Sequence, residues 1–168
     1  MADFDAIAIL TVLQQHGVVF VVIGGWAAVA HGSPLPTRDV DVVPEQGSDN
    51  LTRLSAALTA LDARVRHGDD EPLPFRHDAA SLAGSSLLNL TTIHGDLDIV
   101  SAPSGTQGYV DLRRDAIEVT LRGTPVLLAS LADVIRSKEA AGRDKDRRSL
   151  PVLRELLADQ LRAKRRRS

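Results

Sequence analysis

The sequence predicts an α+β fold, an α/β sandwich in which short strands and helices are mixed and helices close the chain. Short β-branched apolar runs bounded by glycine or proline indicate strands, and longer stretches with apolar residues at helical spacing indicate helices. Hydrophobic residues make up 43% of the 168-residue chain and charged residues 25%, which is typical of a globular domain. Because only 3% of the residues are aromatic, aliphatic side chains must fill the core.

The first part of the chain alternates helix and strand. The predicted elements are a helix over residues 3–16, a buried strand over 18–23, a short helix over 26–31 and a strand over 39–43. Asp3 is a possible N-cap of the first helix, and Gly17 ends it. Pro44 ends the second strand, whose polar and apolar residues alternate as they do when one face of a strand is open.

The middle of the chain predicts a helix and then a hairpin. The predicted elements are an amphipathic helix over residues 49–61, a short strand over 64–66, a loop over 67–80, and strands over 87–93 and 97–100. The loop contains Pro72, Pro74 and three consecutive acids. His94 and Gly95 form the turn between the last two strands.

The end of the chain is mainly helical. The predicted elements are a strand pair over residues 117–121 and 126–128, a helix from Ser130 towards Gly142, and a last helix over about 147–164. Pro151 falls in the first turn or two of the last helix, so the start of this helix could be as late as Ser149. We therefore divide the chain into a core domain, residues 1–128, and a C-terminal helical segment with a basic tail, residues 129–168.

Composition excludes several classes of site. The chain has no cysteine, so it forms neither disulfides nor a thiolate zinc site, and its five histidines lack ligand-like spacing. It has no run of eighteen apolar residues, and acids stand at the N-terminus where a secretory signal carries lysine or arginine. We expect a cytoplasmic protein that does not bind membranes.

Charge is distributed unevenly. Residues 1–135 hold 8 Lys and Arg against 17 Asp and Glu, whereas residues 136–168 hold 12 against 5. This division is typical of a metal-binding body joined to a surface that meets polyanions, but solubility alone also accounts for it. The basic run from Arg162 to Arg167 has the same two interpretations, a solubilising end or an RNA-facing patch.

Gly24, Gly25 and two aspartates predict a phosphate site beside a metal site. Glycines after a strand let backbone amides approach an anion, and the helix that follows presents unpaired N–H groups. Asp39 and Asp41 stand two residues apart on one strand, so their carboxylates share a face and can ligate one hard cation or two neighbouring ones. Clustered acids repel each other, and bound magnesium resolves the repulsion. A nucleoside triphosphate fits this arrangement.

A third carboxylate is expected from the neighbouring hairpin. Asp98 could bind a second metal ion and act as the general base that takes the proton from an attacking hydroxyl. Asp96 competes for this role. We favour Asp98 because apolar residues flank it within the strand, whereas Asp96 is at the turn.

These residues resemble a known family. The stretch from Ile23 through Gly24-Gly25-Trp26 to Thr37-Arg38-Asp39-Val40-Asp41 resembles the core motif of the DNA polymerase β-like nucleotidyltransferase superfamily. The segment from Ile135 to Asp146 resembles the lysine-bearing helix of AbiEii-like and MenT-like toxin nucleotidyltransferases, which belong to type IV toxin–antitoxin systems. The resemblance spans about residues 18–157.

The resemblance implies a mixed, largely antiparallel sheet flanked by helices and magnesium-dependent transfer of a nucleoside monophosphate with release of pyrophosphate. It implies tRNA as the acceptor for the toxin group. By matched position it implies Gly25 at the triphosphate, Asp39, Asp41 and Asp98 at magnesium, and Lys138 at the phosphates. Lys145 and Asp146 match a further position whose role is open. We expect the nucleotide-binding residues to be Gly24, Gly25, Thr37, Arg38 and Lys145.

Some positions depart from the family or have ordinary interpretations. Gly24-Gly25 replaces the commoner Gly-Ser pair, as in the antibiotic- and toxin-type branches, and lacks a hydroxyl that would contact phosphate. Lys138 has the alternative of an ordinary solvated lysine. We expect Trp26 to pack in the core more than to stack on a nucleotide base. We leave His31 out of the site because it ends a short helix.

Three functions remain open from the sequence. The first is transfer of a nucleoside monophosphate to a hydroxyl, plausibly the 3′ end of tRNA, by a toxin with a cognate antitoxin. The second is transfer to a small molecule such as an aminoglycoside or lincosamide, with the acids at 69–71 suited to a cationic drug. The third is an antitoxin-like protein that binds or modifies a protein partner.

Overall fold

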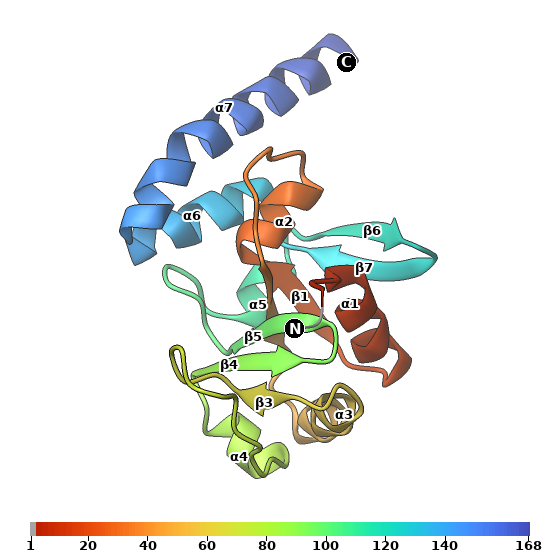
Figure 1. Cartoon of the computed structure of the whole chain (residues 1–168). Coiled ribbons are helices and arrows are strands. Elements are labelled where there is room, and N and C mark those ends of the chain that lie inside the picture. The colour runs from red at the N-terminus through yellow and green to blue at the C-terminus, as the bar shows by residue number, and fades with distance from the viewer. Residues whose placement is uncertain (1–2) are drawn as a thin grey trace.

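One mixed sheet forms the centre of the chain in the computed structural model, which describes residues 3–168 (Figure 1). Its strands are β1 (Phe20–Ile23), β2 (Asp39–Pro44), β3 (Arg64–Val65), β4 (Leu87–Thr92), β5 (Gly95–Val100), β6 (Ile117–Leu121) and β7 (Thr124–Leu128). Their order across the sheet is β3-β4-β5-β2-β1-β7-β6. The β2–β5 and β1–β7 pairs are parallel and the others antiparallel. The expected mixed, largely antiparallel sheet is confirmed.

Helices flank this sheet. They are α1 (Ala6–Gln15), α2 (Gly24–Ala30), α3 (Ser48–Ala60), α4 (Ala79–Ala83), α5 (Tyr109–Leu112), α6 (Leu131–Ala141) and α7 (Asp144–Arg166). The α1 helix packs against β7 and α3, whereas α2 packs against β1, β2 and α6. The α7 helix packs on α6 and extends past the sheet to the C-terminus (Figure 1).

The core is aliphatic, as the composition predicts. The largest side chains that are fully buried within residues 3–168 are all leucine or isoleucine: Ile9, Leu10, Leu13, Leu51, Leu54, Leu58, Leu61, Leu90, Leu97, Leu112, Leu128 and Leu153. They come from both helices and strands, and together they bury the continuous apolar surface that stabilises the fold. No helix in this part of the chain is long and apolar enough to cross a membrane.

Local signals placed the α6 helix well. The Ser130 hydroxyl accepts a hydrogen bond from the Asp133 amide at 3.1 Å, which caps the first turn. Gly142 ends the helix with φ +62°, in the left-handed region that glycine adopts without strain. Both positions agree with the sequence prediction.

Two helix starts differ from the prediction. Asp5, not Asp3, caps α1, because its carboxylate accepts from the Ala8 amide at 3.0 Å. The α7 helix begins at Asp144, before the predicted start at residues 147–149, so Pro151 lies within the helix instead of in its first turns. Pro151 is exposed, and its missing N–H removes only one hydrogen bond from a long helix.

Two short helices were not expected. The α4 helix begins within the predicted 67–80 loop, and Asp78 starts it with a reciprocal capping pair to Ser81. The α5 helix follows Gly108, and its Tyr109 and Leu112 pack into the core. Such short helices depend on tertiary packing more than on periodicity, so helical spacing gives little signal for them.

Candidate active site

All of the predicted site residues line one cleft of about 1060 Å³. They are Gly24, Gly25, Thr37, Arg38, Asp39, Asp41, Asp98, Lys138 and Lys145. The sheet supplies one side of the cleft through β2 and β5, and α6 and the start of α7 supply the other. The site is therefore built from both parts of the chain, and the domain division at residue 128 stays a prediction.

Four carboxylates form the sheet side of the cleft, which we call the acidic wall: Asp39, Asp41, Asp96 and Asp98. The parallel register of β2 and β5 pairs Asp39 with Asp96 and Asp41 with Asp98. Because register partners in a parallel pair point to the same face, and residues two apart on a strand do too, all four side chains share that face.

The inner pair of this wall carries perturbed carboxyl groups. Burial, followed by the charges of Asp39 and Asp98, raises the pKa of Asp41 to about 7. Burial also raises the pKa of Asp98, to about 6, and the charge of Asp39 adds to this while Arg66 opposes it. Burial and the neighbouring carboxylates therefore both favour the neutral form of these two groups.

The Gly24-Gly25 pair has a structural reason that differs from the predicted one. Gly24 has φ +77°, and a Cβ there would overlap the Asp41 carboxylate. At Gly25 a Cβ would meet Thr37 Oγ1 at 3.2 Å, which is tight but tolerable. Gly24 is therefore required so that the carboxylate can lie against the backbone where α2 begins. Thr37 in turn donates from Oγ1 to Asp39 Oδ1 at 3.2 Å.

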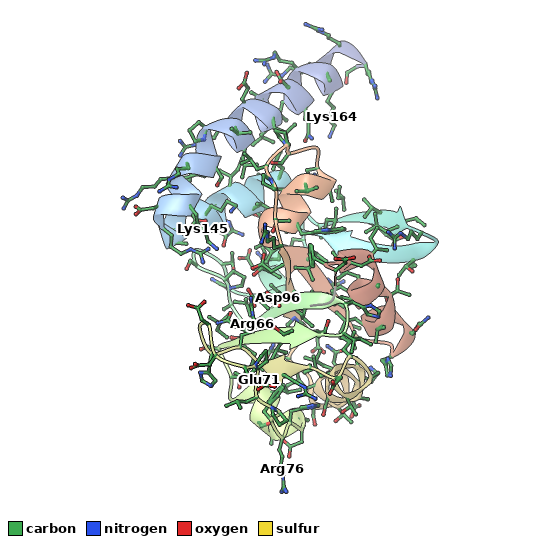
Figure 2. All side chains as sticks on the ribbon, viewed as in Figure 1. Arg66, Glu71, Arg76, Asp96, Lys145 and Lys164 are labelled. Carbon is green, nitrogen blue, oxygen red and sulfur yellow. The ribbon has the colours of Figure 1, made fainter. Side chains whose placement is uncertain are left out.

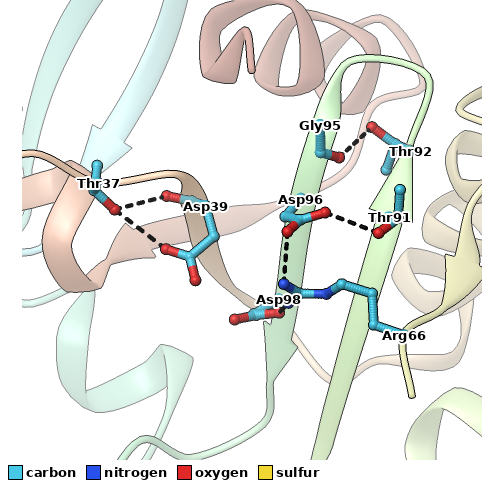
Figure 3. A network of polar contacts seen from close by, with 8 residues as sticks. All are labelled: Thr37, Asp39, Arg66, Thr91, Thr92, Gly95, Asp96 and Asp98. Carbon is cyan, nitrogen blue, oxygen red and sulfur yellow. Dashed lines mark hydrogen bonds and ion pairs between the residues drawn. The ribbon is translucent and has the colours of Figure 1, made fainter. Parts of the chain in front are cut away.

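Arg66 is a site residue that the sequence did not single out (Figure 3). Its Nη1 pairs with Asp96 Oδ2 at 2.7 Å, and its Nη2 pairs with Asp98 Oδ1. Asp96 also accepts from Thr91 Oγ1 at 2.8 Å. Arg66 follows β3, and both of its partners lie on β5, far along the chain. Residue spacing therefore contains no signal for these contacts.

The helical side of the cleft is the basic wall: Lys138, Arg143, Lys145 and Arg148. Its anchor is Asp146, which is fully buried. Asp146 pairs with Lys138 Nζ at 3.4 Å and with Arg143 Nε at 2.8 Å. Figure 2 labels Lys145 at the start of α7, across the cleft from Asp96 and Arg66 on the sheet side. Asp146, whose role the sequence left open, thus holds Lys138 in place.

Two residues of the acidic wall fit a magnesium ion. Carboxylate oxygens are the ligands that hard cations prefer. The raised pKa of Asp41 shows that its ionised form is disfavoured, and a bound cation would offset this. Asp39 and Asp41 fit such an ion. Within residues 3–168, however, no three Asp, Glu or His side chains are grouped so that they could hold a metal ion together. Asp98 is instead paired with Arg66.

Residues set aside in the sequence lie away from the cleft. Trp26 is half-buried and packs against the core, as expected. The His31 ring bonds to the Ala129 carbonyl through Nε2 at 2.8 Å. The acids at 69–71 do not line the cleft, and Glu71 borders a separate hollow of about 180 Å³. These acids therefore do not contribute to an acceptor site in the cleft.

Solved structures with the same fold are nucleotidyltransferases. One is the lincosamide antibiotic adenylyltransferase LnuA with bound lincomycin, with TM-score 0.61, 13% identity, and coverage of 92% of this chain and 99% of that chain. Another is the antibiotic-resistance factor ANT(2'')-Ia, with TM-score 0.54, 18% identity, and coverage of 95% and 88%. A third is described as a putative nucleotidyltransferase from Thermotoga maritima, with TM-score 0.55, 17% identity, and coverage of 90% and 89%.

The chain therefore has the fold of nucleotidyltransferases, as the resemblance to the polymerase β-like superfamily implied. Neither the protein-family models nor the sequences of curated proteins yield a match to this chain. The finer resemblance to AbiEii-like and MenT-like toxins stays a prediction.

Proposed function

We propose that this protein is a magnesium-dependent nucleotidyltransferase that transfers a nucleoside monophosphate from a nucleoside triphosphate to an acceptor hydroxyl. The acceptor oxygen forms a bond to the α-phosphorus, the bond from that phosphorus to the bridging oxygen breaks, and pyrophosphate leaves. The observation that carries this proposal is the β2–β5 register, which gathers Asp39, Asp41 and Asp98 on one face of a cleft with lysines opposite.

The acidic wall supplies the metal and proton chemistry of the proposal. Asp39 and Asp41 would hold magnesium, which when bound offsets negative charge on the phosphates. Asp98 would take the proton of the acceptor hydroxyl. Its pKa of about 6 suits a base that works near neutral pH, since it is ionised there yet basic enough to accept a proton.

The basic wall would bind the triphosphate. Lys138 is held by Asp146 with its side chain only 14% exposed, so it is positioned before substrate arrives. Lys145 and Arg38 are exposed residues of the same cleft and would offset charge that builds on the departing pyrophosphate. Gly25 and Thr37, which both line the cleft, would border the nucleotide.

An RNA 3′ end, plausibly that of tRNA, is the first candidate acceptor. The supporting observation is the charge of α7, which starts with Lys145 and Arg148 in the cleft and ends with Lys164 to Arg167, all exposed. Cations along one helix neutralise backbone phosphates, and their binding weakens steeply with salt. A role as a toxin with a cognate antitoxin belongs to this candidate.

A small molecule is the second candidate acceptor. Of two proteins of the same fold, one is by name a lincosamide antibiotic adenylyltransferase and the other an antibiotic-resistance factor, and this chain covers 99% and 88% of their lengths. A cleft of about 1060 Å³ is at the upper end of the range for small-molecule sites, so it has room for a triphosphate and a small acceptor. The third candidate is a protein acceptor or partner, and no surface observation supports it.

The test is incubation with magnesium, each α-labelled triphosphate in turn, and either total cellular RNA or a panel that includes lincomycin and tobramycin. We expect label to enter one acceptor class with the wild type and not with Asp39→Ala. The matched control is Asp69→Ala, an exposed acid outside the cleft, which should retain transfer. Label on RNA supports the first candidate, and label on a drug supports the second. No transfer to any acceptor, protein included, would overturn the proposed function.

A further inference from the structure

We propose that the guanidinium of Arg66 takes the place of a second metal ion, so that the cleft holds a single divalent cation on Asp39 and Asp41. This inference rests on the proposed function and concerns the number of ions in the site. It replaces the expectation from the sequence that two neighbouring ions bind.

The first observation is the geometry of the Arg66 side chain. One guanidinium bridges two carboxylates of the acidic wall, with Nη1 on Asp96 and Nη2 on Asp98 (Figure 3). Arg66 therefore occupies one of the two Asp98 oxygens, Oδ1, and places a positive charge where a second ion would bind. The N–H groups of a planar guanidinium fork are spaced so that one side chain can donate to two carboxylates.

The second observation is how firmly Arg66 is tied to this position. Its backbone amide donates to the Asn89 carbonyl at 2.9 Å, which joins it to β4 beside β5. Its Nε is buried and has no hydrogen-bond partner among residues 3–168. The side chain thus depends on Asp96 and Asp98 for its polar contacts, and Asp96 is itself fixed by Thr91.

The third observation is the asymmetry of the acidic wall. Asp96 and Asp98 share an internal cation, whereas no ion pair involves Asp39 or Asp41 within the described part of the chain. A second metal ion on Asp98 would face the positive charge of Arg66, and displacing Arg66 would leave its side chain, 26% exposed, without one of its two carboxylate partners. A first ion on Asp39 and Asp41 would displace no ion pair of the described residues.

The experiment counts bound ions directly. Mn²⁺ is titrated into the full chain with a non-hydrolysable α,β-methylene triphosphate, and free Mn²⁺ is followed by electron paramagnetic resonance. We expect one ion per chain for the wild type and for Arg66→Lys, which keeps the charge. Arg66→Gln should bind two ions, and Arg66→Gln combined with Asp98→Asn should return to one.

The matched control is Arg64→Gln, two residues away on β3, which pairs with exposed Asp62 and does not line the cleft. It should bind one ion. Should Arg66→Gln fail to fold by circular dichroism, Asp96→Asn loosens Arg66 more mildly and should tighten binding of a second ion by roughly tenfold. A wild type that binds two ions or none, or variants whose ion count and affinity do not change, would overturn the proposal.

The two proposals fail in different ways. A protein that transfers nucleotide with two ions bound contradicts the role of Arg66 and leaves the proposed function standing. A protein that binds one ion and transfers no nucleotide to any acceptor contradicts the proposed function alone.

Discussion

The two walls of the cleft are stabilised in opposite ways. On the basic wall, burial alone would raise the pKa of Asp146, but the hydrogen bond and charge of Arg143 and the charge of Lys138 outweigh it, and the pKa is lowered. On the acidic wall, burial and like charges raise the pKa of Asp41 to about 7, and the lysines opposite only reduce this. On the basic wall the buried carboxylate is paired with two cations, whereas on the acidic wall Arg66 pairs with Asp96 and Asp98 and not with Asp41.

This difference separates residues that stabilise the fold from residues that we expect to bind a ligand. A buried carboxylate with two cationic partners contributes to stability above its pKa. A buried carboxylate beside other carboxylates destabilises the folded state, and such groups persist at functional sites. Substitutions on the two walls should therefore have opposite effects on stability.

The largest expected effect is on catalysis at the acidic wall. Asp41→Asn keeps the shape of the side chain but removes the charge that would hold magnesium. We expect the rate of nucleotide transfer to fall by at least about a thousandfold. The measurement is label transfer to whichever acceptor the wild type uses, with circular dichroism as the control for folding. Transfer within about tenfold of the wild type would contradict the role of Asp41.

The next effect is on stability at the basic wall. Asp146→Ala leaves Lys138 and Arg143 without their buried partner and should lower the free energy of unfolding by about 3 kcal/mol. Urea unfolding at neutral pH measures it. Because the pKa of Asp146 is lowered, its contribution is present above the unfolded value of 3.8 and is lost as pH falls through the folded value.

The control for Asp146 is Asp144→Ala in the same first turn of α7. The side chain of Asp144 is 83% exposed and pairs with exposed Arg147, so its loss should change stability by less than about 1 kcal/mol. Equal effects at the two positions would show that the buried pair does not organise the basic wall.

A smaller effect distinguishes the two glycines beside the acidic wall. Gly24→Ala forces a Cβ onto the Asp41 carboxylate at a positive φ and should cost about 2 kcal/mol of stability as well as transfer activity. Gly25→Ala meets only Thr37 Oγ1 and should be close to neutral. Thermal unfolding of both variants measures the difference. If Gly24→Ala proved as stable as Gly25→Ala, the close approach of Asp41 would be disproved.

The smallest effect is a gain in stability. The pKa of Asp41 is raised from 3.8 to about 7, so the unfolded chain releases this proton first and stability falls between about pH 4 and pH 7. Asp41→Asn avoids this loss and should be more stable than the wild type at pH 8 without divalent ions, by on the order of 2 kcal/mol. The gain should vanish near pH 4.

Magnesium provides a further test of the prediction for Asp41→Asn. Saturating magnesium should stabilise the wild type and not Asp41→Asn, because a ligand that binds only the folded state raises its stability. The difference in stability between the two proteins at pH 8 should therefore shrink or change sign. A ranking that is the same with and without magnesium would contradict a metal site at Asp41.

Elements with strong local signals were predicted from the sequence. The buried β1 strand, the shared face of Asp39 and Asp41, and the two ends of α6 each depend on a few neighbouring residues. The start of α7 differs from the prediction because Pro151 favours a helix that begins near residue 149, whereas the capping contact between Arg143 and Asp146 starts the helix at Asp144. The short α4 and α5 helices were missed because packing stabilises them.

The sequence by itself determined which chemical groups this protein has and the order in which they follow: two glycines after a buried strand, two aspartates on one face of a strand, a third aspartate in a later strand, and lysines near the end. Local periodicity and spacing are enough for that. Only the tertiary structure decided which strand lies beside which. The parallel pairing of β2 with β5 brought Asp41 opposite Asp98, and contacts with β5 gave Arg66 its role. Such contacts join residues far apart along the chain, so no local pattern contains them.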